Sequence, residues 1–84
     1  MSRFEKLKER LISEPRDLSF EELETLLGYF GYRKENKGKT SGSRVIFVSN
    51  KAHVIMLHKP HPRNVIPLYQ IKQIIAALKE EGLI

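Results

Sequence analysis

The sequence predicts a single α+β domain in which a three-stranded antiparallel sheet packs on helices, in the order α-α-β-β-β-α. Three observations lead to this class. Apolar residues recur at helical spacing before residue 31 and again after residue 67. Between them lie short runs of β-branched and aromatic residues, separated by turn-forming residues. With 84 residues, the chain is long enough for one core only.

The first element is a short amphipathic helix. Phe4, Leu7 and Leu11 recur at i, i+3 and i+7, with glutamate and lysine between them. The helix ends before Pro15, because the residue that precedes a proline avoids the helical region. We therefore expect residues 1–14 to form an added N-terminal helix and residues 19–84 to form the rest of the domain.

The second helix has a complete start signal. Ser19 is its expected N-cap, and Glu22, three residues later, completes a capping box. Leu18 is placed to pack on Leu23 as a hydrophobic staple. Gly31 is the expected left-handed residue after the last turn. The apolar stripe of this helix consists of Leu23, Leu26, Leu27 and Phe30.

Three strands are expected next. Residues 32–36 form a short, polar first strand, and a basic, glycine-bearing loop follows it. Residues 45–48 and 54–57 form two further strands joined by a hairpin turn. Both of these strands are apolar on both faces at their centres. A single helical layer covers one face, so we expect the N-terminal helix, a second copy of the chain or a partner protein to cover the other.

Residues 58–64 contain two prolines and are expected to be a rigid, exposed connection. Asn64 is the expected cap of the last helix, with Pro67 in its first turn. Gly82 is expected to end that helix. Its predicted buried stripe consists of Leu68, Ile71, Ile74, Ile75 and Leu78.

Several classes of protein are excluded by what the sequence lacks. Without cysteine, it has no disulfide, thiol nucleophile or thiolate metal site. No apolar run approaches the ~20 residues of a membrane span, and the charged N-terminus is not a signal peptide, so we expect a cytoplasmic protein with no membrane contact. The known phosphate-loop, hydrolase and metalloprotease motifs are absent, and we expect no cofactor and no metal.

Positive charge is concentrated in the middle of the chain. The net charge is +5, and the segment from Arg33 to Arg63 holds eight basic residues and one acidic residue, a local excess of +7. The remaining residues are seven basic and nine acidic. Such a segment predicts an anionic partner, with nucleic acid as the leading candidate. The alternative is a solvated loop surface without a ligand.

Two basic segments are candidates for chemistry. In the first, Lys39 to Arg44, glycine lets the backbone approach a phosphate, the Ser43 hydroxyl donates to it and Arg44 grips it with two N–H groups. In the second, His58-Lys59-Pro60-His61, a neutral histidine can accept the proton of a ribose 2′-hydroxyl while a neighbouring cation stabilises the phosphate. The alternatives are a plain hairpin loop and two solvated histidines. We interpret His53 as structural.

Aromatic side chains are scarce in this chain. Phe30 and Phe47 are expected to be buried, which leaves Tyr29, Tyr32 and Tyr69 as possible stacking surfaces. We therefore expect RNA to be held by its phosphates and 2′-hydroxyls rather than read by stacked aromatic residues.

The run from Leu23 to Ile84 resembles the HicA family of bacterial toxin–antitoxin systems. The matching segments, in order, are Leu27-Gly28-Tyr29-Phe30-Gly31-Tyr32, Gly42-Ser43, His58-Lys59-Pro60-His61-Pro62, Tyr69-Gln70-Ile71-Lys72-Gln73-Ile74-Ile75 and Gly82-Leu83-Ile84. The resemblance implies a fold like that of double-stranded-RNA-binding domains, α-β-β-β-α, here with an extra N-terminal helix. It also implies cleavage of mRNA and neutralisation by a HicB-type antitoxin.

The chain departs from the family at one position. A histidine taken to be catalytic follows the Gly-Ser pair in the family, whereas this chain has Arg44, which does not lose its proton. The resemblance therefore implies a binding role at this position, and catalysis is expected from His61, with His58 assisting. The expected RNA-binding residues are Lys39, Ser43, Arg44, Lys59 and Arg63.

Three functions remain open at this point. The first is a metal-independent endoribonuclease that acts on mRNA. The second is an RNA-binding module without catalysis. The third is a protein-interaction domain, in which a homo-oligomer or an antitoxin complex covers the second face of the sheet.

Overall fold

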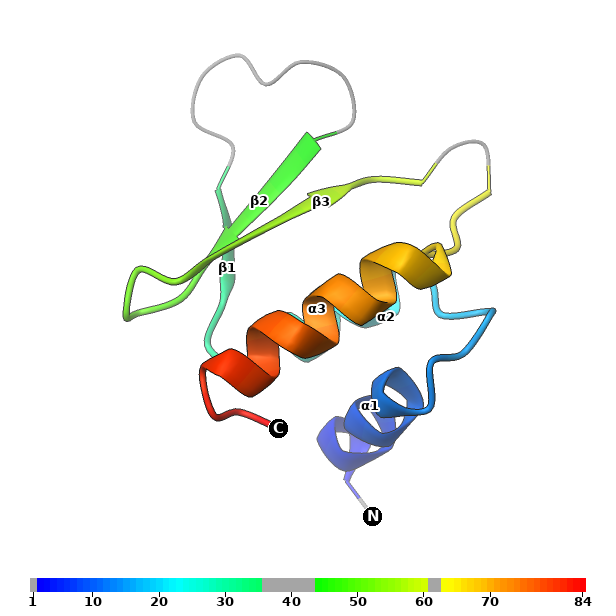
Figure 1. The fold of residues 1–84 in the computed structure, drawn as a ribbon, viewed down its shortest axis with the longest axis horizontal. Coiled ribbons are helices and arrows are strands. Elements are labelled where there is room, and N and C mark those ends of the chain that lie inside the picture. The colour runs from blue at the N-terminus through cyan, green and yellow to red at the C-terminus, as the bar shows by residue number, and fades with distance from the viewer. Residues whose placement is uncertain (1, 36–43, 61–62) are drawn as a thin grey trace.

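Three helices and a three-stranded antiparallel sheet make up the chain in a computed structural model, which describes residues 2–35, 44–60 and 63–84 (Figure 1). The strands lie in the order β1-β2-β3. This arrangement confirms the predicted fold class and element order. The elements are α1 (Arg3–Ile12), α2 (Phe20–Tyr29), β1 (Arg33–Glu35), β2 (Arg44–Val48), β3 (Val54–His58) and α3 (Leu68–Glu80).

The ends of α2 form as predicted. The Ser19 hydroxyl accepts a hydrogen bond from the Glu22 amide at 3.1 Å, and the Glu22 carboxylate accepts one from the Ser19 amide at 3.0 Å. At the other end Gly31 has φ +92°, and the Tyr32 amide donates back to the Leu27 carbonyl at 2.9 Å. These bonds satisfy one unpaired backbone group at each end of the helix, and the last of them turns the chain toward β1.

The prediction that Asn64 caps α3 is wrong. The helix begins only after Pro67, whose ring carries no hydrogen-bond acceptor, so no side chain caps this end. The residues before Pro67 instead run extended beside the start of α2, where the Ile66 amide donates to the Leu18 carbonyl at 2.8 Å. The Asn64 side chain donates to the carboxylate of Glu21. The connection is therefore fixed to α2 by backbone pairing, a long-range contact that helix-start patterns do not reveal.

The core lies between the helices and one face of the sheet. It takes Leu7 and Leu11 from α1, and Phe47, Ile55 and Leu57 from the two longer strands. Helix α1 packs on α2 and α3, and α3 lies between it and the sheet (Figure 1). The N-terminal helix therefore does not cover the second face of the sheet, which removes one of the three expected covers.

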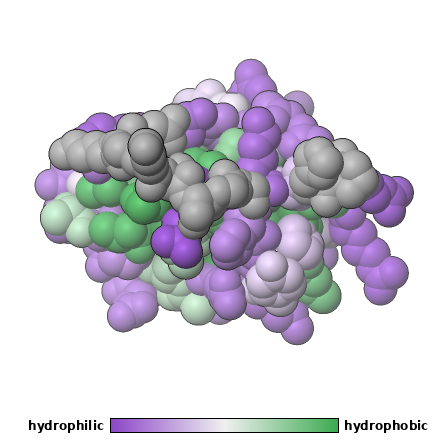
Figure 2. Space-filling view, turned by 90° about the horizontal axis from the view of Figure 1, so that it is seen from above, coloured by the Kyte–Doolittle hydropathy of each residue, from purple (hydrophilic) through white to green (hydrophobic). Residues whose placement is uncertain are grey.

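That second face, which we call the open face, exposes apolar side chains. Val54 is 55% exposed and Met56 50% exposed, and their partners across the strands are Val48 and Ile46. Figure 2 shows apolar surface beside polar surface on the side of the molecule that carries the strands. The pairing register places the following residues on the open face: Arg33, Glu35, Arg44, Ile46, Val48, Val54, Met56 and His58.

Candidate nucleic-acid interface

Two of the predicted site residues are neighbours on the open face. Arg44, the first residue of β2, pairs directly with His58, the last residue of β3. Directly opposed residues of antiparallel strands have Cβ atoms only ~4.5–5.5 Å apart and point to the same face. Both residues are exposed. The sheet therefore brings a guanidinium and an imidazole together at the end where β2 begins and β3 ends, although the two residues lie in different segments of the sequence.

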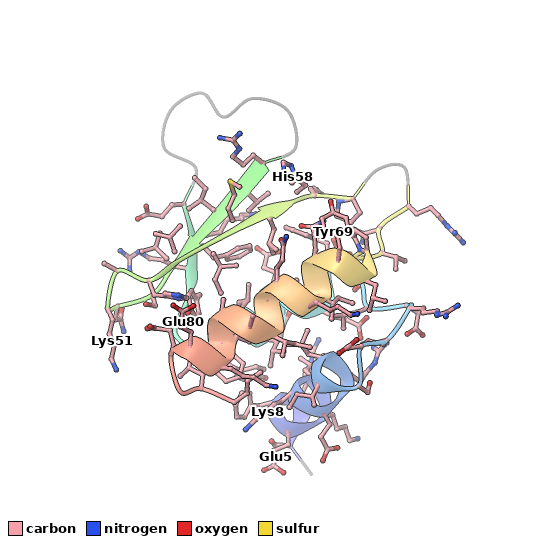
Figure 3. All side chains as sticks on the ribbon, in the orientation of Figure 1. Glu5, Lys8, Lys51, His58, Tyr69 and Glu80 are labelled. Carbon is pink, nitrogen blue, oxygen red and sulfur yellow. The ribbon has the colours of Figure 1, made fainter. Side chains whose placement is uncertain are left out.

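A groove of about 300 Å³ begins at this end of the sheet and runs between the end of β3 and the start of α3. Figure 3 shows His58 and Tyr69 at this end of the molecule, with Lys51 and Glu80 at the other. The groove thus joins the predicted residues His58, Lys59 and Arg63. Its lining consists of His58, Lys59, Pro60, Arg63, Val65, Pro67, Tyr69 and Gln70.

The cations at this end of the sheet form no ion pairs within the described part of the chain. Arg44, Lys59 and Arg63 have no carboxylate within ion-pair distance there, whereas Lys34 lies 3.3 Å from Glu24. Lys59 instead places its ammonium 5.7 Å from the ring centroid of Phe20. Cations without a carboxylate partner are available to an anionic ligand.

A buried glutamine fixes the backbone of His58. The Gln70 side chain, in a residue only 3% exposed, accepts a hydrogen bond from the His58 amide at 3.0 Å and donates one to the His58 carbonyl at 3.3 Å. These two bonds take the place of a fourth strand at the free edge of β3 and tie that edge to α3. Sequence reasoning missed Gln70. Its position four residues before Ile74 and eight before Leu78 was the available signal, and the predicted stripe residue Leu68 is 43% exposed instead.

Replacing Gln70 by leucine is expected to lower the free energy of unfolding by about 1–3 kcal/mol, because it leaves the amide and carbonyl of His58 without partners. Urea denaturation followed by circular dichroism measures the loss. Gln73, which is exposed on the same helix, is the matched control, and Gln73→Leu is expected to change stability by less than about 0.5 kcal/mol. Equal effects of the two substitutions would mean that the bonds to His58 do not stabilise the fold.

His53 lies at the opposite end of β3 and has a partner of its own. The Tyr32 hydroxyl lies 2.6 Å from His53 Nδ1, and the two rings meet edge to face. Burial, and to a smaller degree the charge of Glu81, raises the pKa of Tyr32 above its usual value near 10. Tyr32 therefore stays protonated at neutral pH and holds His53, in agreement with a structural role for this histidine.

The three tyrosines differ in what they offer a ligand. Tyr32 is buried, so it is not a stacking surface. Tyr29 is exposed, but its ring lies 5.5 Å from that of Phe4. Tyr69 is 58% exposed and lines the groove. Of the two buried phenylalanines predicted, Phe47 is buried and Phe30 is partly exposed.

The other predicted site residues, His61, Lys39 and Ser43, lie outside the described residues. Among residues 2–35, 44–60 and 63–84, no three histidine, aspartate or glutamate side chains come close enough to share a metal ion. Over the same residues, none of the helices has the length and apolar character that a membrane span requires.

Comparison with protein families gives one match. A family model described as the HicA toxin of bacterial toxin–antitoxin systems matches residues 20–83, which include α2, the sheet, α3 and the whole groove and leave α1 outside. Searches of the curated proteins and of the solved structures returned no significant match.

Proposed function

The chain belongs to the HicA toxin family of bacterial toxin–antitoxin systems, and from this premise we propose that it is a cytoplasmic endoribonuclease that cleaves mRNA without a metal and is neutralised by a HicB-type antitoxin. The observation that carries the proposal is the pairing of Arg44 with His58, close to cations that form no ion pair with another described residue. Lys39, Ser43, Lys59 and Arg63 are proposed to hold the RNA backbone around this pair.

The proposed reaction uses the ribose 2′-hydroxyl as the nucleophile. One histidine accepts the proton of this hydroxyl, and the 2′-oxygen bonds to phosphorus. The bond from phosphorus to the 5′-oxygen breaks, and this oxygen takes a proton from the second histidine. The products are a 2′,3′-cyclic phosphate and a 5′-hydroxyl. Arg44 stabilises the negative charge that develops on the phosphoryl oxygens. We assign proton transfer to His61 as base or acid, with His58 as the second group.

The proposal is tested by incubating the protein with a long mRNA transcript in excess EDTA. We expect fragments whose 5′ ends polynucleotide kinase labels without prior phosphatase treatment, because 2′-hydroxyl attack leaves a 5′-hydroxyl. RNA that remains intact at high protein excess would contradict an endoribonuclease. Fragments with 5′-phosphate ends would contradict the proposed nucleophile.

A second candidate function, RNA binding without cleavage, is favoured by one observation: arginine occupies position 44, where the resemblance implies a catalytic histidine. This function predicts RNA binding that weakens with salt, with a slope near ~0.7 per phosphate contacted on a single strand, and no fragments. Gain of cleavage by Arg44→His in an otherwise inactive protein would support it. Cleavage by the unaltered chain decides in favour of the first function.

We also propose that the antitoxin covers the open face. Ile46, Val48, Val54 and Met56 form an apolar strip there, and Arg33 and Arg44 flank it, which suits a partner with apolar and acidic residues. A second copy of the chain is the competing cover. Light scattering separates the two, because a homo-oligomer forms without any partner whereas the proposed antitoxin complex does not.

A further inference from the structure

We infer that the groove between the end of β3 and the start of α3 binds one nucleotide of the RNA, with the base stacked on Tyr69 and its phosphate held by Lys59 and Arg63. This inference rests on the proposed function and deepens it, because it assigns a base-binding subsite next to the proposed reaction centre. It keeps the expectation from the sequence that stacked aromatic residues do not read the RNA sequence, and assigns Tyr69, one of the three tyrosines named there, a positioning contact with a base.

Tyr69 is exposed beside the groove and is therefore accessible to a base. It lies in the first turn of α3, is 58% exposed and forms part of the lining of this space of about 300 Å³. A volume of this size is at the lower end for ligand pockets, which suits a single nucleotide. An exposed tyrosine alone is common on protein surfaces. The feature that distinguishes Tyr69 is the groove beside it.

The rest of the lining matches the two parts of a nucleotide. Pro60, Val65 and Pro67 supply apolar surface for a base, and Lys59 and Arg63 supply positive charge for a phosphate. None of the described residues that line the groove is acidic. The positive charge of the lining therefore favours an anionic ligand over a cationic one. The apolar part of the lining favours a nucleotide over a bare phosphate.

His58 links this groove to the proposed reaction centre. It belongs to the groove lining and is also the cross-strand partner of Arg44. A strand whose reacting phosphate lies at Arg44 and His58 would therefore place an adjacent nucleotide in the groove. The geometry makes stacking on Tyr69 part of how the cleaved strand is positioned.

The groove is expected to accept any base. Gln70 is the one amide side chain in its described lining, and both of its polar groups are used by the backbone of His58. With that amide occupied, stacking on the tyrosine ring is the main contact to the base, and stacking tolerates every base because each has a π-face. The groove therefore positions RNA without selecting its sequence.

The test uses the absence of tryptophan from the chain. Tyr69→Trp introduces a single tryptophan into the groove, and Tyr29→Trp places one at a similarly exposed tyrosine, 52% exposed, that is not part of the groove. Each variant is titrated with a 2′-O-methyl oligonucleotide, which lacks the nucleophilic hydroxyl and is not cleaved, and with an abasic oligonucleotide of the same length and charge. Anisotropy of a dye on the oligonucleotide reports binding independently.

We expect the base-bearing oligonucleotide to quench the fluorescence of the Tyr69→Trp variant and to leave that of the Tyr29→Trp variant unchanged. The abasic oligonucleotide is expected to bind without quenching either. Tyr69→Ala is expected to weaken binding of the base-bearing oligonucleotide by about tenfold, with little change for the abasic one.

The outcomes separate this inference from the proposed function. Binding by anisotropy without quenching at position 69 would overturn the subsite and leave RNA binding intact. If neither oligonucleotide binds and the transcript stays intact, the subsite and the proposed function both fail. Quenching at position 69 by an antitoxin protein but by no oligonucleotide would assign the groove to the protein partner and overturn the inference.

Discussion

Replacing His58 and His61 together by alanine is expected to slow RNA cleavage by about 10²–10⁴-fold or to abolish it, because the double variant loses both proposed proton-transfer groups and the remaining histidine, His53, lies just before the far end of β3. Arg44 stays protonated and cannot substitute as a base. The measurement is the rate at which a defined transcript is cut in EDTA at protein excess. A double variant that cuts at the rate of the unaltered protein would show that the histidines are wrongly assigned.

His53→Ala is the matched control for these histidines. His53 lies just before β3 and His58 ends that strand five residues later, about 17 Å away at the rise of an antiparallel strand, and the Tyr32 hydroxyl is hydrogen-bonded to His53. We expect His53→Ala to lower stability and to leave the cleavage rate of the folded protein near normal. The assay is therefore run at a temperature where circular dichroism shows all variants folded.

The two single variants divide the roles. If His58 is the more important group, as its position opposite Arg44 allows, His58→Ala alone should reproduce most of the loss in the double variant. If His61 carries the main proton transfer, His61→Ala should do so. RNA binding is expected to survive in both, since Arg44, Lys59 and Arg63 keep their charges, so a loss of binding along with cleavage would point to a misfolded site.

Local signals made the secondary structure predictable. The capping box at Ser19 and Glu22 and the glycine at position 31 are short-range patterns, and each forms as expected because its partners lie within a few residues. The two longer strands, β2 and β3, were predictable from their β-branched and other apolar residues for the same reason. Asn64 was misassigned because a long-range backbone pairing with the start of α2 outweighs a local cap.

The site was less predictable than the fold. Arg44 and His58 could each be chosen from the sequence, but their pairing depends on the register of β2 against β3, which the hairpin sets. Gln70 could not be distinguished from a surface glutamine without knowing that α3 lies along the free edge of β3. The exposure of Tyr69 was predictable from its place outside the apolar stripe of α3, but the groove beside it was not, because it forms between α3 and the end of β3. Tertiary contacts thus decide how the predicted residues combine.

Helix α1 raises a different question, because the family match begins at residue 20 and leaves this helix outside. Leu11 is completely buried and Leu7 is 5% exposed, and both belong to the single core cluster of the described chain. The Arg10 side chain also bonds to Asp17, at 2.9 Å, and to Glu22 of the capping box. These contacts indicate that α1 is part of the folding unit rather than an appendage to it.

We therefore expect Leu11→Ala to lower the free energy of unfolding by about 2–5 kcal/mol, since it removes buried methyl groups and leaves a cavity among α1, α2 and α3. A domain of this size has a total stability of only ~5–15 kcal/mol, so the loss is a large part of it. Ile12→Ala is the control from the next position, where the side chain is 49% exposed, and we expect a change within about 0.5 kcal/mol.

Urea denaturation monitored by circular dichroism compares the two variants, and Leu11→Val, a smaller truncation, keeps the comparison possible if Leu11→Ala does not fold. A large loss at Leu11 with a single cooperative transition means that the proposed RNA-binding site depends on α1, because α1 packs on α3 and α3 holds the backbone of His58 through Gln70. An equally small effect at both positions would instead make α1 a separable addition, and the domain would then be complete from residue 19 onward.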